Sequence, residues 1–287
     1  MRAAVDLHDT ARGPIAVCTW LFGDHDHQRI AERVARLGFD GVEMLADITR
    51  CSPSALRDLY ADAGLSVISL TPDNVDIAHI DDRQRHHAVG YYERLIGFAA
   101  ELGCPRVTCH ERVGRLRPVD TVDAEWDRLV VSCRQLAEVA TDYGISLVFE
   151  PLHRGLVSQI HRADEVCRLV DAVGHPALSV VLDTYHVCLE ESDPTAVFQR
   201  CGGWVTAVQL GDTDRLPLGL GTAPLGSCLG ALDSIGFTGP WILECTSQLS
   251  GPSLTPRTIN SEQVERELGT SLRWLHSQWA TRPPRLC

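Results

Sequence analysis

Short apolar runs recur along the chain, and four consecutive runs in its second half each end on a side chain that carries oxygen. The clearest run is Leu178–Leu182, which contains two adjacent valines and stops at Asp183. Such a run, bounded by polar residues, predicts a strand that is buried in a parallel sheet. The other three runs have the same form: Ile145–Phe149 before Glu150, Trp204–Val208 before Gln209, and Pro240–Leu243 before Glu244.

The rest of the chain alternates between further apolar runs and stretches with helical spacing. Additional strands are predicted at Ile15–Trp20, Phe39–Leu45, Leu65–Thr71 and Arg106–His110. Polar caps and glycine stops help to bound the helices, which are predicted at His25–Leu37, Pro53–Ala63, Asp82–Leu102, Val122–Tyr143, Arg162–Val173, Pro194–Arg200, Gly226–Ile235 and Ser261–Trp279. The pattern therefore contains eight strand–helix units.

Alternation of this kind predicts an α/β fold in which a parallel sheet closes into a (β/α)8 TIM barrel. A doubly wound open sheet is the alternative, but no GxGxxG sequence follows the first strand. Because there is no internal linker or repeat, we expect residues 1–287 to form one domain. The barrel core is expected over residues 14–280, with loosely held ends at 1–13 and 281–287.

Composition excludes several classes of partner and site. The chain of 287 residues has a formal net charge of −12 and no basic run, so we do not expect it to bind nucleic acid. No apolar stretch approaches the ~18 residues that a membrane span needs, and the first residues carry acids where a signal peptide is apolar. We therefore expect a cytoplasmic protein. The 11 cysteines are scattered without CxxC pairs, which favours neither a disulfide framework nor a zinc site.

The four polar residues that end the later strands are candidate metal ligands. In a barrel the ends of neighbouring strands converge, so Glu150, Asp183, Gln209 and Glu244 are expected to meet. Clustered carboxylates repel one another unless a cation lies between them. A ligand set made of oxygen favours a divalent metal such as Mn²⁺ or Mg²⁺ over zinc. The alternative is that each acid only caps a strand end or forms a salt bridge.

The motifs, taken in order, carry a family resemblance. The sequence reads GFDGVEM on the second strand, VFEPLHR around Glu150, LDTYH around Asp183, VQLGDTDR after Gln209, and SLRWL near the end. In this order the chain resembles the xylose-isomerase-like TIM barrels, a sugar isomerase and epimerase group. That group includes ketose 3-epimerases, hydroxypyruvate isomerases, and inosose and 3-dehydroshikimate dehydratases.

The resemblance implies a ligand set of Glu, Asp, His and Glu, which Glu150, Asp183 and Glu244 match. Gln209 departs from it, because the usual VHL is VQL here. The 3-dehydroshikimate dehydratases of the superfamily are similar in having Gln at this place, which favours dehydration. A second departure lies six residues after Glu150, where the ketose epimerases carry an acid that contacts substrate. This chain has Leu156, which counts against an ordinary free-ketose epimerase.

Other polar residues are expected at the mouth of the barrel. The resemblance implies that His186 contacts substrate oxygen or acts as an acid or base, and that Arg215 binds substrate. A helix-capping His and a surface Arg are the alternatives. His110, Glu43, His153 and Trp20 lie at or near predicted strand ends, so we expect them to contact substrate as well. A hydrogen-bonded structural role is an equal alternative for His110, and packing is the alternative for Trp20.

The reaction that the resemblance implies is proton removal next to a carbonyl, with the metal holding the enediolate. Glu150 and Glu244 would be the acid–base pair. The first interpretation is a metal-dependent isomerase or epimerase of a small keto-sugar or keto-polyol. The first alternative is a dehydratase of a cyclic keto-polyol, in which His186 would be the acid. The second alternative is a non-catalytic binding barrel. The oligomeric state, including a homo-oligomer, is left open.

Overall fold

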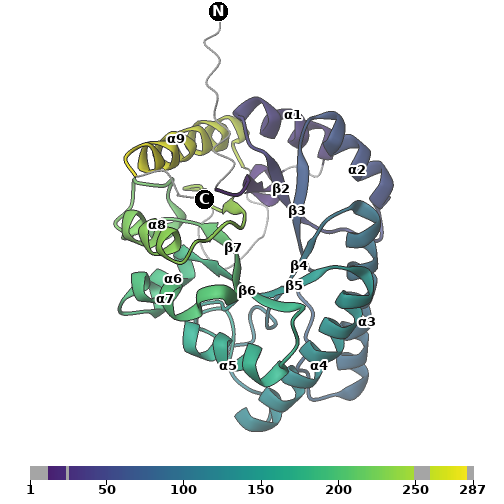
Figure 1. Ribbon diagram of the computed structural model, residues 1–287. Coiled ribbons are helices and arrows are strands. Elements are labelled where there is room, and N and C mark those ends of the chain that lie inside the picture. Colours follow the sequence, from purple (N-terminus) through teal and green to yellow (C-terminus); the bar gives the residue numbers. More distant parts are fainter. Residues whose placement is uncertain (1–11, 24–25, 249–258, 283–287) are drawn as a thin grey trace, which may run out of the picture.

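The computed structural model describes residues 12–23, 26–248 and 259–282, which form a closed parallel barrel (Figure 1). Neighbouring strands pair in chain order, and β1 pairs with β8 to close the barrel. The strands are β1 (Ile15–Cys18), β2 (Gly41–Leu45), β3 (Ser66–Thr71), β4 (Arg106–Cys109), β5 (Ser146–Phe149), β6 (Leu178–Asp183), β7 (Val205–Leu210) and β8 (Trp241–Leu243). The predicted (β/α)8 TIM barrel is confirmed.

Helices surround the strands, and the last helix lies beside the first (Figure 1). Their bounds are α1 (His27–Leu37), α2 (Pro53–Asp62), α3 (Asp82–Leu102), α4 (Val122–Tyr143), α5 (Ala163–Val173), α6 (Thr184–Glu190), α7 (Pro194–Cys201), α8 (Leu225–Ser234) and α9 (Ser261–Ala280). Short 3-10 turns occupy Thr19–Phe22, Gly202–Trp204 and Thr213–Arg215. Among the described residues, none of the helices has the length and apolar character to cross a membrane.

Local sequence signals explain where the helices begin and end. The Ser52 hydroxyl accepts a hydrogen bond from the Ala55 backbone N–H, and Pro53 occupies the first turn of α2. The Asp81 carboxylate accepts from the Gln84 backbone N–H at the start of α3. Gly103 ends α3 with a φ of 79°, a left-handed conformation that suits glycine. These signals are local, so they can be recognised in the sequence.

The structure corrects the predicted elements at two places. The first strand is shorter than Ile15–Trp20, because the 3-10 turn Thr19–Phe22 begins after Cys18 and carries Trp20. The short helix α6 was not predicted; it begins directly after Asp183, whose carboxylate caps it by accepting from the Tyr185 N–H over 2.9 Å. The expected start of the first helix at His25 lies outside the described residues, as do most of the two ends expected to be loosely held.

Candidate active site at the carboxyl ends of the strands

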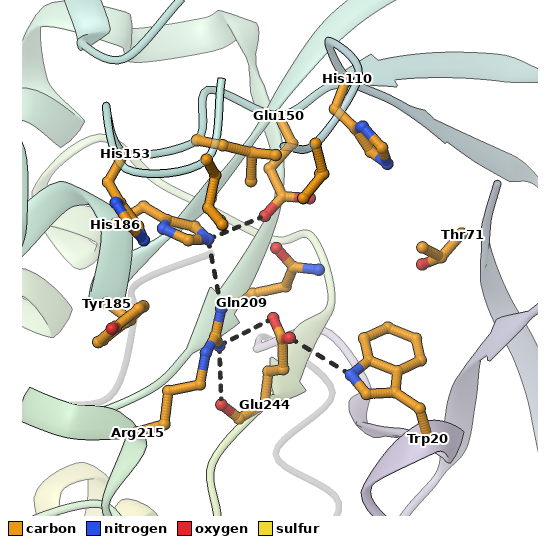
Figure 2. A pocket seen from close by; sticks show the side chains of 13 residues that line it. Trp20, Thr71, His110, Glu150, His153, Tyr185, His186, Gln209, Arg215 and Glu244 are labelled. Atoms are coloured by element: carbon orange, nitrogen blue, oxygen red, sulfur yellow. Dashed lines mark hydrogen bonds and ion pairs between the residues drawn. The ribbon is translucent and has the colours of Figure 1, made fainter. Parts of the chain in front are cut away.

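The four polar residues that end the later strands meet at one end of the barrel, where Figure 2 shows three of them, Glu150, Gln209 and Glu244. Asp183 ends β6 and pairs in register with Gln209 of β7, while Glu150 and Glu244 directly follow β5 and β8. All four are buried, with Asp183 fully enclosed. The prediction that the strand ends converge is therefore confirmed.

A pocket opens above these strand ends. It contains nearly all the expected site residues, together with several that were not predicted. Its lining consists of Trp20, Thr71, His110, Val113, Glu150, Leu152, His153, Leu156, Tyr185, His186, Gln209, Arg215 and Glu244. Figure 2 shows His153, Tyr185 and His186 on one side and Trp20, Thr71 and His110 on the other.

Three residues at this end of the barrel are close enough to share a metal ion. Glu150, Asp183 and His186 each offer one ligand atom, and these atoms lie within 4.8 Å of one another. The His186 Nε2 atom is 3.6 Å from Asp183 Oδ2 and 3.9 Å from Glu150 Oε1. His186, which was not in the predicted ligand set, belongs to this group, and the Glu244 carboxylate contacts Arg215 and Trp20.

Gln209 presents a buried oxygen to the same pocket. Its Nε2 donates a hydrogen bond to Glu43 Oε1 over 2.8 Å, whereas its Oε1 is buried and has no hydrogen-bond partner among the described residues. A buried acceptor without a partner is costly, and a cation would satisfy it. Together with the carboxylates of Glu150 and Asp183, this oxygen makes the donor set suitable for a divalent metal.

Glu43 lies beneath the pocket rather than in its lining. The side chain is fully buried, and its Oε1 accepts hydrogen bonds from Gln209 and from the Thr71 hydroxyl. Glu43 is not among the residues that line the described pocket, whereas its partners Gln209 and Thr71 are, and its expected substrate contact stays a prediction. Burial raises the pKa of Glu43 to about 7, although the hydrogen bonds from Gln209 and Thr71 act in the opposite direction.

Arg215 reaches into the carboxylate cluster. Its Nη1 lies 3.2 Å from Asp183 Oδ2 and 3.1 Å from Glu244 Oε2, and the guanidinium stacks on the Tyr185 ring at 4.4 Å. Its Nη2 lies 3.3 Å from His186 Nε2. Because a guanidinium only donates, this contact makes Nε2 of His186 an acceptor and the imidazole neutral. Arg215 lines the pocket as predicted, but it also supplies positive charge to two carboxylates.

A single buried aspartate organises the loop that carries Arg215. The Asp212 carboxylate accepts four backbone N–H groups, those of Thr213, Gly219, Gly221 and Ala223. Gly221 packs so closely that an added Cβ would lie 2.3 Å from Asp212 Oδ1. Both Asp214 and Arg215 have positive φ values, of 55° and 56°, which are uncommon for side chains of this size. The loop thus holds Arg215 in place at some conformational cost.

Burial dominates the proton chemistry of the site. It raises the pKa of Glu150 well above its usual value, and the charges of Glu244 and Asp183 add to this effect. Burial also raises the pKa of Glu244, to about 7, although Arg215 opposes the shift. The pKa of His186 is lowered well below its usual value by burial and by Arg215. The acids therefore need a positive neighbour to ionise fully, and His186 is held neutral.

The remaining predicted residues line the pocket as expected. Trp20 donates from its indole N–H to Glu244 Oε1 over 3.3 Å. The Nδ1 atom of His110 lies 2.7 Å from the Glu111 carbonyl oxygen, so Nδ1 carries the proton and Nε2 is an acceptor. Burial lowers the pKa of His110, which favours this neutral form. His153 lies against the rings of Tyr185 and His186.

Sequence reasoning missed Tyr185 and Thr71 as pocket residues. Tyr185 stands between Asp183 and His186 in the LDTYH motif, and its ring supports the Arg215 guanidinium. Thr71 is the last residue of β3, the position that supplies Asp183 on β6. A search for polar side chains at every strand end would have found Thr71. Tyr185 required knowledge of the helix α6 that begins after Asp183.

Residues 31–278 match the family model described as xylose isomerase-like TIM barrel. The chain belongs to this family. The match covers all strands except the first and confirms the resemblance that the motifs indicated.

The relatives of this xylose isomerase-like barrel include epimerases and a dehydratase. A D-psicose 3-epimerase of Ruminiclostridium cellulolyticum is 28% identical over 79% of the chain and 80% of its own length. A 3-dehydroshikimate dehydratase of Pseudomonas putida is 28% identical over 74% of the chain but only 35% of its own length. These relatives confirm the expected class, an enzyme of the sugar isomerase and epimerase group.

Solved structures support the fold. A D-allulose 3-epimerase from Methylomonas sp., in complex with D-allulose, superposes with a TM-score of 0.83 at 21% identity, covering 93% of this chain and 97% of that one. At this identity the likeness concerns the barrel architecture. The reaction of this family member has to be argued from its own residues.

Proposed function

We propose that this barrel catalyses epimerisation or isomerisation of a small keto-sugar or keto-polyol by moving a proton at the carbon next to the carbonyl. The observation that carries the proposal is the pairing of Glu150 and Glu244. Both are buried, both line one pocket, and they follow β5 and β8. Two carboxyl groups that reach a substrate from different strands can remove a proton and return one.

A divalent metal fits the donor set at this site. Glu150, Asp183, Gln209 and Glu244 would hold it, and a cation would satisfy the buried Gln209 Oε1, which has no hydrogen-bond partner among the described residues. Oxygen ligands favour Mn²⁺ or Mg²⁺. When bound, such a cation supplies a Lewis acid that polarises a carbonyl oxygen.

The chain's other side chains would bind and orient the substrate. Arg215 offers fixed N–H donors to hydroxyl or carbonyl oxygens, since its loop is held by Asp212. His110 offers a neutral Nε2 that accepts from a hydroxyl. His186, also neutral, is placed within 4 Å of Glu150 and Asp183 and can exchange a proton with a bound oxygen. Trp20 and Tyr185 line the pocket on two sides and would restrict the access of water.

Dehydration of a cyclic keto-polyol is the second candidate. Gln209 favours it, because Gln at this place resembles the 3-dehydroshikimate dehydratases, and one relative carries that name. The first step would be the same proton removal by a buried glutamate. The two reactions diverge only at the next step, where a hydroxyl group leaves instead of a proton returning.

The proposal is tested by proton NMR of ketoses and cyclic keto-polyols incubated with the Mn²⁺-loaded protein in D₂O. We expect loss of the proton signal next to the carbonyl, together with a new epimer or isomer. A product that has lost water, with an alkene signal, would select the dehydratase. The Glu262→Gln variant is the control, since that acid lies on the exposed face of α9. Unchanged spectra across the panel would contradict both candidates.

A further inference from the structure

Part of the pocket is lined by aliphatic side chains. Leu152, Leu156 and Val157 form an apolar cluster separate from the barrel core, and Val113 packs against it. Val113, Leu152 and Leu156, which we call the apolar wall, line the same pocket as the two glutamates. Leu152 and Leu156 are only 5% and 7% exposed. Each of the other side chains lining the described pocket carries a nitrogen or oxygen atom.

Every backbone N–H and carbonyl group of the apolar wall already has a hydrogen-bond partner within the protein. Asn74 accepts from the Val113 N–H and donates to its carbonyl oxygen, over 2.8 and 2.9 Å. The Leu152 N–H and carbonyl pair with Ile160 and His161. The Leu156 N–H donates to the His153 carbonyl, and its own carbonyl accepts from the Gly114 N–H over 2.7 Å. A substrate hydroxyl placed here would find every backbone group already paired.

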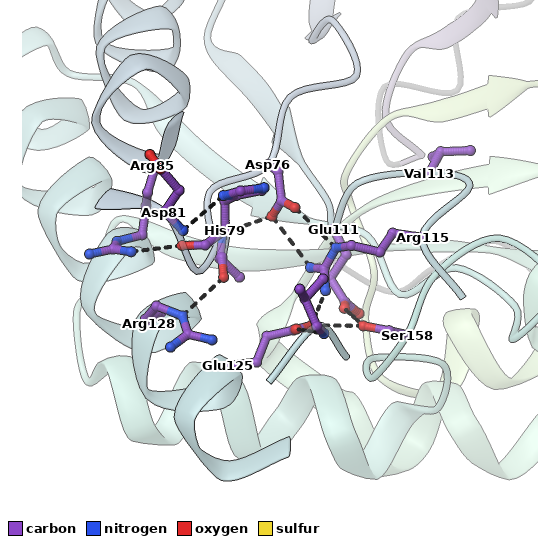
Figure 3. A network of polar contacts seen from close by, with 12 residues as sticks. Asp76, His79, Asp81, Arg85, Glu111, Val113, Arg115, Glu125, Arg128 and Ser158 are labelled. Atoms are coloured by element: carbon purple, nitrogen blue, oxygen red, sulfur yellow. Dashed lines mark hydrogen bonds and ion pairs between the residues drawn. The ribbon is translucent and has the colours of Figure 1, made fainter. Parts of the chain in front are cut away.

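Buried ion pairs and hydrogen bonds hold the two loops of the apolar wall in position (Figure 3). The Glu111 carboxylate accepts from the Ile160 N–H and from the Ser158 hydroxyl. Figure 3 shows Arg115 between Asp76 and Glu125, with which it forms ion pairs. The bonds of Glu111 join the Glu111–Asp120 loop to the residues before α5, and Arg115 joins the same loop to Asp76 and Glu125. These links hold Val113, Leu152 and Leu156 in position.

We propose that the apolar wall determines specificity, and that the natural substrate is a keto-polyol carrying a methyl or methylene group where it meets this wall. The inference rests on the proposed function, because it concerns the substrate of that same pocket. A polar group buried without a partner costs free energy, whereas a C–H group in contact with leucine side chains gains it. A deoxy compound, either open-chain or cyclic, leaves no hydroxyl unpaired at the wall and places a C–H group against the leucine side chains.

The expected consequence is a preference between matched substrates. A methylene in an apolar pocket, or a hydroxyl left unpaired there, typically changes kcat/KM by about 10- to 200-fold. We would compare ketohexoses with their 1-deoxy and 6-deoxy forms on the Mn²⁺-loaded protein. Deuterium exchange in D₂O reports kcat/KM for each compound. Calorimetric dissociation constants for the same compounds give a second readout that does not require turnover.

Two variants test whether the apolar wall causes the preference. Val113→Thr keeps the shape of the side chain and replaces one methyl group with a hydroxyl, so the variant should fold. The kcat/KM of the deoxy compound, divided by that of its parent, should be smaller in this variant than in the native protein. Leu156→Gln should reduce this ratio of kcat/KM values further, by about tenfold or more. Val131→Thr is the matched control, because Val131 lies on α4 and is 60% exposed. Its ratio should equal that of the native protein.

The outcomes separate this inference from the proposed function. A deoxy preference in the native protein that falls in Val113→Thr supports the apolar wall. Equal kcat/KM and equal dissociation constants for parent and deoxy compounds would overturn it, while exchange of both would leave the proposed reaction standing. If the deoxy compounds bind more tightly than their parents but none of them exchanges a proton for deuterium, the inference about the apolar wall stands and the proposed reaction is contradicted.

Discussion

Gln209 and Glu43 are joined across the barrel by a hydrogen bond of 2.8 Å from the amide Nε2 to the carboxylate Oε1. The amide nitrogen of Gln209 thus faces Glu43, and the amide oxygen, which has no hydrogen-bond partner among the described residues, faces away from it. Ligands of a metal are commonly oriented by a partner of this kind. Glu43, which we first expected to contact substrate, thus becomes the residue that aims Gln209.

Glu43→Gln should therefore weaken metal binding without removing a ligand. With an amide at position 43 the orientation of Gln209 is no longer enforced, and partners of this kind are worth about 10- to 100-fold in metal affinity. Calorimetric titration with Mn²⁺ measures the change. Glu32→Gln on the exposed face of α1 serves as the control. An unchanged dissociation constant in Glu43→Gln would show that the Glu43–Gln209 bond does not orient a ligand.

Gln209→His should change which metal is preferred. An amide oxygen is a harder donor than an imidazole nitrogen, so the native protein should favour Mn²⁺ or Mg²⁺. The His variant should shift the ranking toward Co²⁺, Ni²⁺ or Zn²⁺, and its affinity should depend more on pH because imidazole titrates near neutrality. Dissociation constants between pH 6 and 8 decide this. If the two proteins rank the metals alike, residue 209 is not a ligand.

Asp212→Asn should disturb the loop that presents Arg215. An amide nitrogen in place of one carboxylate oxygen would face two of the four N–H donors that Asp212 now accepts. An unmade buried hydrogen bond costs about 1–3 kcal/mol, so the free energy of unfolding should fall by that amount. Hydrogen exchange of residues 213–223 should accelerate. The neighbouring Asp214→Asn variant should leave both measurements near the native values, because Asn accepts positive φ.

Glu125→Gln should destabilise the protein in a way that depends on pH. Burial alone would raise the pKa of Glu125, but the neighbouring Arg115 guanidinium and the hydrogen bond from the Ser158 hydroxyl outweigh it and lower the pKa. A lowered folded-state pKa contributes stability above the unfolded value of about 4.5, and this is lost as pH falls through the folded value. Urea unfolding should show a deficit for Glu125→Gln at pH 7 that shrinks below pH 4. A deficit that is constant with pH would contradict the ion pair with Arg115.

The fold and the converging strand ends could be predicted because their signals are local. Apolar runs that stop at Glu150, Asp183 and Glu244, with glycine stops such as Gly103 between them, specify the order of elements, and barrel closure then brings their ends together. Gln209 was recognised from the same alternation. The register of β6 and β7, which sets Asp183 beside Gln209, follows from the parallel pairing.

The remaining features depend on contacts between distant residues. Glu43 is hydrogen-bonded to Gln209, which is 166 residues away in the sequence. The position of Glu43 on β2 does not reveal this contact, so the sequence alone suggested that Glu43 lines the pocket. The position of Arg215 between Asp183 and Glu244 follows from the loop around Asp212, whose bonds are not visible in a pattern of apolar and polar residues. The sequence showed that Leu156 stands where the ketose epimerases carry an acid. That Val113 packs against the cluster containing Leu156 could be seen only in the folded structure.

The central claim is that Glu150 and Glu244 move a proton next to a carbonyl, and deuterium incorporation tests it most directly. A keto substrate that the protein converts would be incubated with Mn²⁺ in D₂O, and recovered substrate and product would be analysed by mass spectrometry and NMR. We predict one deuteron at the carbon next to the carbonyl. Glu150→Gln and Glu244→Gln, each still folded, should slow its appearance by about 10²–10⁴-fold. Conversion without deuterium, or both variants incorporating it at the native rate, would contradict the account.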